Sequence, residues 1–222
     1  MSDYNPSHNL WSLNGGVVML KRLGVFAAAA VLVCLLAVPA AAQNTSAGIQ
    51  AGASLANLGG DLSGDLDSNL GFGVGAFFAL DLSEYFRLQF QGQYVQKGAK
   101  DSDFDEKINM HYIELLIPLT LTIPMDSPIE PRLYAGPAIG LNMRCNFANG
   151  QSVDCKDITS SIDYGIFFGA GTDYMVGSGA IMLDVWYNKG LANVNDDTDS
   201  DTFSVKTQTW QFMAGYRFFL GG

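Results

Sequence analysis

The first residues to consider for chemistry are His111 and Glu114, because His111 is the only histidine beyond the N-terminal apolar region. A histidine supported by a carboxylate can act as the general base for a nucleophilic hydroxyl group. On a β-strand, however, residues three apart in the chain point to opposite faces. No other histidine in this part of the chain could replace His111 as the base. We therefore expect that the protein is not an enzyme.

Two acidic runs contain carboxylates spaced two residues apart, a pattern that can converge on a hard cation such as calcium. Neither run has the glycine at the sixth position and the glutamate at the twelfth position of an EF-hand loop. Solvated loops whose charges repel one another are therefore the simpler interpretation, and calcium binding is the weaker alternative. The carboxylates in question belong to Asp101, Asp103, Asp105, Asp197, Asp199 and Asp201.

Residues 19–42 have the pattern of a secretory signal peptide. Lys21 and Arg22 precede a run of Ala, Val and Leu that ends in small residues at 40–42, so we predict cleavage after Ala42. Residues 1–18 are then interpreted as an extension ahead of the true start at Met19, and residues 43–222 as the exported domain. Cleavage removes two cations and one anion, so the formal net charge of −10 becomes −11. Such an acidic domain excludes nucleic acid as a partner.

The two cysteines of the exported domain, Cys145 and Cys155, lie in one polar segment. In an oxidising compartment a disulfide between them is the simplest interpretation, with free thiols as the alternative. The segment lacks the further Cys or His ligands that a zinc site needs.

The elements that position these residues are strands with a two-residue rhythm. In residues 86–94, Phe86, Leu88, Phe90 and Tyr94 share one face, while arginine and glutamine side chains share the other. A helix would need apolar spacings of three and four residues. The pattern therefore predicts a strand with one apolar face and one polar face.

The same rhythm recurs eight times, and the connections alternate between long polar loops and tight turns. Outer-membrane barrels have this asymmetry, with long loops outside the cell and short turns in the periplasm. The sequence therefore predicts an all-β fold, an eight-stranded antiparallel up-and-down transmembrane β-barrel with both chain ends in the periplasm. The expected strands span residues 47–58, 70–80, 86–97, 111–123, 132–143, 161–174, 180–189 and 205–219.

The face that points inward distinguishes a membrane barrel from a soluble one such as a lipocalin. If the apolar face were the interior, rows of glycine would lie on a wall exposed to water, which weakens strands. With the apolar face toward lipid, the glycines instead leave room inside a narrow barrel for long side chains. We therefore predict a charge network in the lumen, formed by Arg87, Glu114, Arg132, Asp163, Asp173, Asp184 and Arg217.

Aromatic residues support the same orientation, because tyrosine and tryptophan prefer the membrane interface. On the predicted lipid face, aromatic side chains gather near the two ends of the strands, which gives two girdles. The set near the long loops is Tyr94, Tyr164, Tyr187 and Trp210, and the set near the short turns is Phe78, Phe86, Tyr216 and Phe218.

These segments resemble the small outer-membrane β-barrel proteins of Bacteroidetes-type bacteria known as the porin family or PorT-like proteins. The resemblance implies a fold and a location and carries no catalytic residues. The chain departs from the family pattern at Gln93 and in the extension 219–222. The matching segments are 91–100, 112–119, 134–137, 165–171, 186–191 and 215–218.

Fold does not determine activity. We expect a non-enzymatic integral outer-membrane protein, without a cofactor, with a structural role or a role in binding an envelope or extracellular partner. Its other expected partners are outer-membrane lipid, lipopolysaccharide and the barrel-insertion machinery. The alternative function is a narrow porin-like channel for small solutes or ions, although an eight-stranded lumen is about wide enough only for side chains. A lipid-modifying barrel enzyme is the least favoured function, because His111 is the only available base.

Overall fold

The computed structural model describes residues 45–60, 67–101, 106–148, 152–154, 160–192 and 205–220. The predicted extension (1–18) and signal peptide (19–42) lie outside these residues and remain predictions. None of the described segments forms a helix with the length and hydropathy of a transmembrane span.

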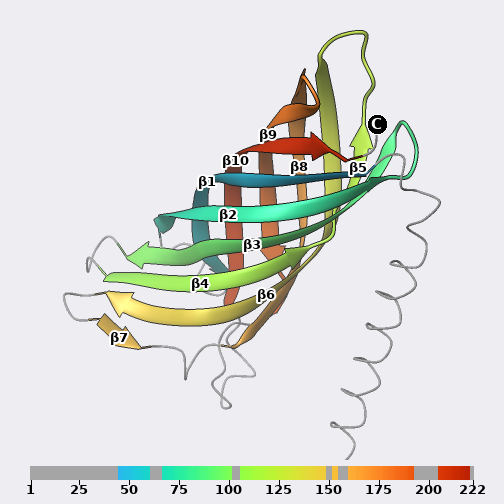
Figure 1. The fold of residues 1–222 in the computed structure, drawn as a ribbon. Helices are drawn as coiled ribbons and strands as arrows, with labels where there is room; N and C mark the ends of the chain where they lie inside the picture. Colours follow the sequence, from blue (N-terminus) through green and yellow to red (C-terminus); the bar gives the residue numbers. More distant parts are fainter. Residues whose placement is uncertain are drawn as a thin grey trace, which may run out of the picture. The chain divides into compact units, whose positions relative to one another are not determined.

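The described chain is built from antiparallel strands, which confirms the predicted all-β class (Figure 1). The strands are β1 (Thr45–Gly60), β2 (Asp67–Asp81), β3 (Phe86–Asp101), β4 (Glu106–Leu116), β5 (Leu119–Thr122), β6 (Ile129–Ala148), β7 (Ser152–Asp154), β8 (Ile162–Val176), β9 (Gly179–Gly190) and β10 (Val205–Phe219).

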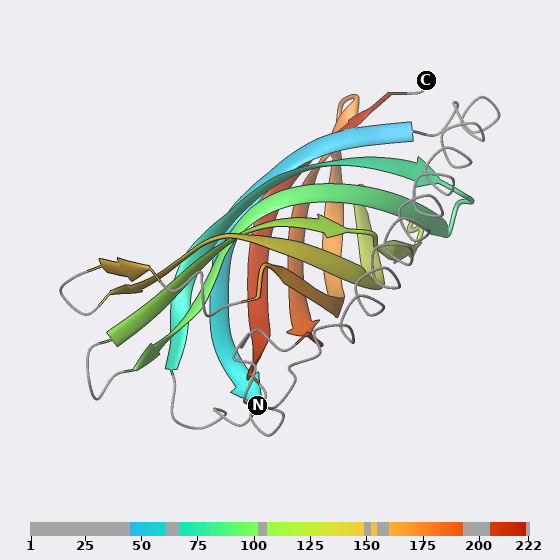
Figure 2. The ribbon, with the colours of Figure 1, turned by 90° about the horizontal axis from the view of Figure 1, so that it is seen from below.

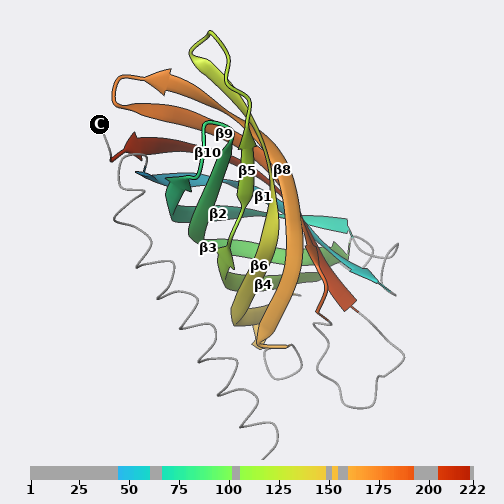
Figure 3. The same ribbon diagram turned by 90° about the vertical axis from the view of Figure 1, so that its right-hand side faces the viewer.

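The strands close on themselves into an up-and-down barrel. The long strands pair in the order β1, β2, β3, β4, β6, β8, β9 and β10, and β1 pairs with β10 to complete the circle. The short strand β5 pairs with β3 and β6, the same two strands that flank β4, so β4 and β5 together occupy one position in the wall. With β7 paired only to β6 among the described strands, the wall has the eight positions that the sequence predicts. Figures 2 and 3 show the curvature of the strands from two further directions.

The predicted strand 111–123 is interrupted at Ile117 and Pro118. Proline has no backbone N–H group and cannot donate to the ladder. The wall stays connected across the interruption, because the amide of Ile117 donates to the carbonyl of Pro137 and the amide of Gln89 donates to the carbonyl of Pro118. The interruption therefore leaves the barrel closed at this point.

Strand β6 continues beyond its predicted end at residue 143, so the expected loop 144–160 is partly strand. Asn142 pairs with Tyr112 and Arg144 pairs with His111, which leaves Met143 as the extra residue of a β-bulge. After the bulge, Cys145 faces inward and is fully buried. The strand then runs to Ala148 and pairs with β7.

The described short connections lie at one end of the barrel, and so do both ends of the barrel chain. The connections are residues 82–85, 123–128 and 177–178. Ser46 pairs with Phe219, and the amide of Leu220 donates to the carbonyl of Thr45. The amide of Phe219 donates to the carbonyl of Ser178 beside the last of these turns, which places the first and last strand ends at the short-turn end.

The two faces of the wall have opposite chemistry, as the alternation predicts. Large apolar side chains are exposed on the outside, for example Leu70 at 69% and Phe72 at 50%. Charged and amide side chains are buried on the inside, and Arg217 and Asp173 have no exposed surface at all. This arrangement is the reverse of a water-soluble protein and suits a wall surrounded by lipid.

Candidate functional site

The candidate site is the lumen, where inward side chains form three layers. A cluster of arginines and carboxylates lies at the short-turn end, an aromatic layer follows it, and a cluster around one lysine lies toward the long-loop end. We call them the arginine cluster, the aromatic layer and the lysine cluster. On β8 the inward residues Asp173, Phe167 and Asp163 belong to the three layers in turn, because every second residue faces the lumen.

The arginine cluster is centred on Asp173, whose carboxylate contacts three guanidinium groups. The atom Oδ1 lies 2.8 Å from Nη2 of Arg132, and Oδ2 lies 2.8 Å from Nη1 of Arg217 and 3.8 Å from Nη1 of Arg87. Arg132 also donates to both carboxylate oxygens of Asp184, at 3.0 and 3.1 Å. The cluster therefore places three buried cations beside carboxylates from β8 and β9.

Two further carboxylates belong to this cluster and were not among the predicted residues. Arg87 donates from Nε to Asp81, and its Nη2 lies 3.6 Å from Oε1 of Glu130. Asp81 lies in a predicted turn and Glu130 lies before the predicted start of a strand at residue 132. Both residues are strand residues in the structure, because β2 and β6 extend further toward the short turns than the hydrophobic pattern indicates.

The lysine cluster is centred on Lys97, which was also missed as a lumen residue. Its ammonium lies 2.6 Å from Oε1 of Glu114 and 3.3 Å from Oδ2 of Asp163. The hydroxyl of Thr207 donates to the same oxygen of Asp163 at 2.6 Å, and the ammonium lies 4.8 Å from the ring centroid of Tyr112. Lys97 lies on the same face of β3 as Arg87 and Gln93, so the alternation of that strand could have identified it.

A row of glutamines on β3 runs along the lumen and ends at the lysine cluster. Gln89 donates to Gln91 at 2.9 Å, Gln91 donates to Gln93 at 3.1 Å, and Gln93 donates to Glu114 at 2.8 Å. Gln93 also donates to Gln211 of β10, at 3.3 Å. The amide row therefore links β3 to β4 and, across the lumen, to β10.

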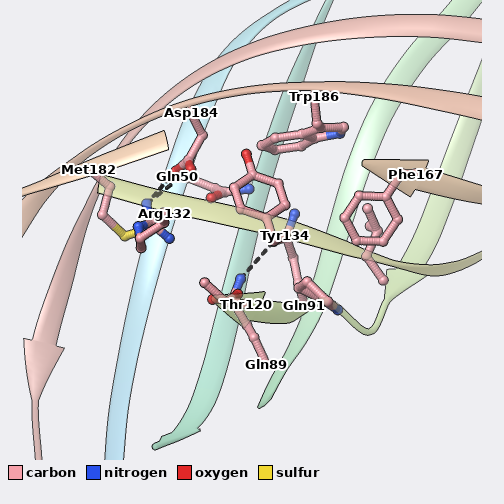
Figure 4. Close-up of a pocket in the computed structure, with 12 residues that line it drawn as sticks. Gln50, Gln89, Gln91, Thr120, Arg132, Tyr134, Phe167, Met182, Asp184 and Trp186 are labelled. Atoms are coloured by element: carbon pink, nitrogen blue, oxygen red, sulfur yellow. Dashed lines mark hydrogen bonds and ion pairs between the residues drawn. The ribbon is translucent and has the colours of Figure 1, made fainter. Parts of the chain in front are cut away.

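Rings from three strands lie between the two charged clusters. Figure 4 shows these rings together with Arg132 and Asp184 of the arginine cluster. The ring centroid of Tyr134 lies 6.4 Å from that of Phe167 and 6.3 Å from that of Trp186. Leu116, Ala138 and Met213 complete this packed group. The cavity beside these rings measures about 10 Å³, which is roughly the space of one water molecule. In the described part of the barrel, the lumen is therefore filled at this level.

Glycines on the inner face make room for these side chains, as the sequence indicates. A Cβ atom added to Gly169 would overlap with Trp186 and Tyr134, and one added to Gly171 would overlap with the carboxylate of Asp184. Gly92 on the outer face is different, because a Cβ atom there would meet no atom within 4 Å.

Gly169→Ala should therefore destabilise the barrel by about 1–3 kcal/mol, since overpacking forces the neighbouring rings out of their places. Gly92→Ala is the matched control and should change stability by less than about 0.5 kcal/mol. Urea unfolding in lipid vesicles, followed by tryptophan fluorescence, measures both. Equal effects of the two substitutions would contradict the packing of the lumen described above.

The remaining predicted residues do not meet in a site. His111 is partly exposed on the outer face of β4, whereas Glu114 is buried in the lumen, as the spacing predicts. Asp101 ends β3, and the other five candidate calcium ligands lie outside the described residues, as does Cys155. The disulfide to Cys145 and calcium binding therefore remain predictions. Among the residues described, no group of three or more His, Cys, Asp or Glu side chains could hold a metal ion.

Comparison with known proteins identifies the architecture. The model of a family described as outer membrane protein beta-barrel domain matches residues 27–218. Neisserial surface protein A (NspA) is 18% identical over 78% of this chain and 96% of that chain, with a TM-score of 0.52. A major outer membrane protein from Thermus thermophilus is 14% identical over 78% of this chain and 99% of that chain, with a TM-score of 0.47. No curated protein matches the chain. Because NspA is only 18% identical to this chain, the similarity shows a common fold and nothing further.

Proposed function

Because the chain belongs to the outer membrane protein beta-barrel domain family, we propose that it is a non-enzymatic barrel of the outer membrane that acts through its outer surface and loops. The observation that carries this proposal is the filled lumen. Two ion clusters and an aromatic layer occupy it, and the cavity beside the rings has a volume of only about 10 Å³. A solute channel needs continuous open space, which barrels of roughly sixteen strands have.

The proposed orientation rests on the connections between the strands. Outer-membrane barrels have short turns on the periplasmic side and long loops outside the cell. The short turns 82–85, 123–128 and 177–178 and both ends of the barrel chain share one end, which supports periplasmic termini. In this orientation the described strand ends that flank the acidic runs lie on the outer side of the membrane. The proposal is that these runs contact an envelope or extracellular partner or bind calcium.

The absence of a catalytic role is supported by the position of His111. Its imidazole forms a hydrogen bond with Tyr94 on the outer surface of the barrel, while the buried carboxylates lie in the lumen. Nucleophilic catalysis requires the base and the group that orients it within hydrogen-bonding reach. The two sets of groups lie on opposite sides of the wall.

Membership of the porin-family or PorT-like subgroup is part of the proposal and is supported by the ordered segments between residues 91 and 218. Partners in the proposal are outer-membrane lipid and lipopolysaccharide around the wall, and the barrel-insertion machinery during assembly. The continuous apolar outer surface and the position of both barrel ends support this set of partners.

The purified full-length protein should show no stepwise ion conductance in planar lipid bilayers, because the lumen is filled. A general diffusion porin measured in the same bilayers provides the positive control. Reproducible single-channel openings of the folded protein would contradict the proposal and favour the narrow channel.

A further inference from the structure

Among the Lys and Arg side chains that the structure describes, those on the outer surface lie at one end of the barrel. Four of these side chains face outward, and all four lie toward the long loops. At the short-turn end, the described Lys and Arg side chains are buried in the arginine cluster, and the exposed charges are Glu84 and Asp126. The four outward cations are Lys100, Arg144, Lys189 and Lys206.

Arg144 lies in register with polar side chains on the next two strands of the wall. Gln96 of β3 pairs in register with His111 of β4, and His111 pairs with Arg144 of β6. The bulge at Met143 turns both Met143 and Arg144 to the outside, so the guanidinium lies at the end of an apolar row that includes Leu141. We call Tyr94, Gln96, His111 and Arg144 the Arg144 patch.

Hydrogen bonds connect the groups of the patch. The amide of Gln96 donates to the hydroxyl oxygen of Tyr94 at 3.4 Å, and the Tyr94 hydroxyl forms a hydrogen bond with Nδ1 of His111. In the tautomer that accepts this bond at Nδ1, the neutral imidazole carries its proton on Nε2, where it is a donor. With the Asn146 amide turned so that its oxygen faces Arg144, this oxygen accepts from Nε of Arg144 at 3.0 Å, which orients the guanidinium and leaves its terminal nitrogens as donors.

The patch also lies at the right height for a lipid headgroup. The ring of Tyr94 lies 5.5 Å from that of Phe72, which is half exposed on the apolar outer surface. Toward the short turns the same strands present Ile113 and Leu141, both about half exposed. A tyrosine, a histidine and an arginine directly above such an apolar surface mark the boundary between acyl chains and headgroups.

We propose that the Arg144 patch binds a phosphate group on an anionic lipid of the outer leaflet. Arginine recognises phosphate through a planar fork of N–H donors, and the imidazole supplies a further donor beside it. This proposal rests on the orientation given under the proposed function, because the long-loop end must face the outer leaflet.

The test is a binding titration of the full-length protein in detergent with lipid A that carries both phosphates, compared with lipid A stripped of phosphate. The phosphorylated lipid should bind more tightly. Arg144→Gln should weaken its binding about tenfold, as expected for a charge-assisted hydrogen bond. His111→Gln should weaken it less. The matched control Lys189→Gln removes an outward cation at the same end of the barrel and should change affinity no more than about twofold.

Three results of the lipid titrations would each overturn the proposal: equal affinity for the two lipids, an Arg144→Gln protein that binds like the wild type, or a Lys189→Gln protein that is weakened as much as Arg144→Gln. The last result would indicate a diffuse charge effect in place of a site. Inorganic phosphate that binds as tightly as the lipid would also overturn the assignment to a headgroup. The lipid titration does not depend on the conductance measurement, so the proposed function and the proposed phosphate site can fail separately.

Each variant is first checked for folding by the difference in gel mobility between heated and unheated samples.

Discussion

Asp173→Ala should lower the free energy of unfolding by about 3–5 kcal/mol, because it leaves buried guanidinium groups without their carboxylate. Asp173 is fully buried and lies 2.8 Å from both Arg132 and Arg217. Arg132 would keep Asp184 as a partner, and Arg87 would keep Asp81. Among the ion pairs described, Arg217 has only the one to Asp173. The loss of Asp173 therefore leaves Arg217 as the guanidinium group with the least charge compensation.

Urea unfolding of the protein in lipid vesicles measures this loss. Asp126→Ala is the control, since Asp126 is exposed in the turn 123–128 and its removal should cost less than about 0.5 kcal/mol. Asp173→Asn keeps the shape of the side chain and removes its charge, so it should destabilise nearly as much as alanine. If Asp173→Ala unfolds at the same urea concentration as Asp126→Ala, the arginine cluster does not contribute to stability as described.

A second consequence of the arginine cluster concerns Arg217 itself. Asp173→Ala combined with Arg217→Met removes the carboxylate and the guanidinium that depends on it most. The double variant should therefore be more stable than Asp173→Ala alone, because replacing both partners of a buried pair avoids an uncompensated charge.

The strands and their faces could be predicted from the sequence because a lipid-facing wall imposes a strict two-residue alternation. Residues 86–94 are the clearest case, since the glutamines and Arg87 share the buried face and Phe86 and Phe90 share the outer one. The seven predicted charged residues of the lumen are all buried in the structure. Their pairing could not be predicted, because it depends on the register between strands that are distant in sequence, as with Lys97 and Asp163.

The errors have local physical causes. The bulge at Met143 inserts one residue, so the alternation changes phase and Cys145 faces inward, although the sequence suggests a loop. Pro118 interrupts the ladder of the fourth predicted strand while apolar residues continue on both sides. Asp81 and Glu130 lie beyond the apolar part of their strands, where the hydrophobic pattern no longer indicates a strand. The strand pairing nevertheless continues there, with Asp81 opposite Arg87 and Glu130 opposite Asp173.

The lysine cluster allows a test of how much a buried cation contributes to the stability of the barrel. Lys97→Met should destabilise the barrel by about 3–5 kcal/mol, since Glu114 and Asp163 would lose the cation that both carboxylates contact. Glu114 would keep the amide of Gln93 and Asp163 would keep the hydroxyl of Thr207, but neither group supplies a positive charge. Lys189→Met is the control, because Lys189 is exposed on the outer face of β9.

The triple variant Lys97→Met, Glu114→Gln, Asp163→Asn removes all three charges and keeps side chains of similar size. It should recover most of the stability that Lys97→Met alone loses, because a buried ion group replaced as a whole is close to neutral. If the triple variant were instead less stable than Lys97→Met, the carboxylates would stabilise the barrel through contacts other than the ammonium. Urea unfolding in vesicles of one lipid composition compares the wild type, Lys97→Met, Lys189→Met and the triple variant. The sign of the difference in unfolding free energy between Lys97→Met and the triple variant shows which of the two outcomes holds.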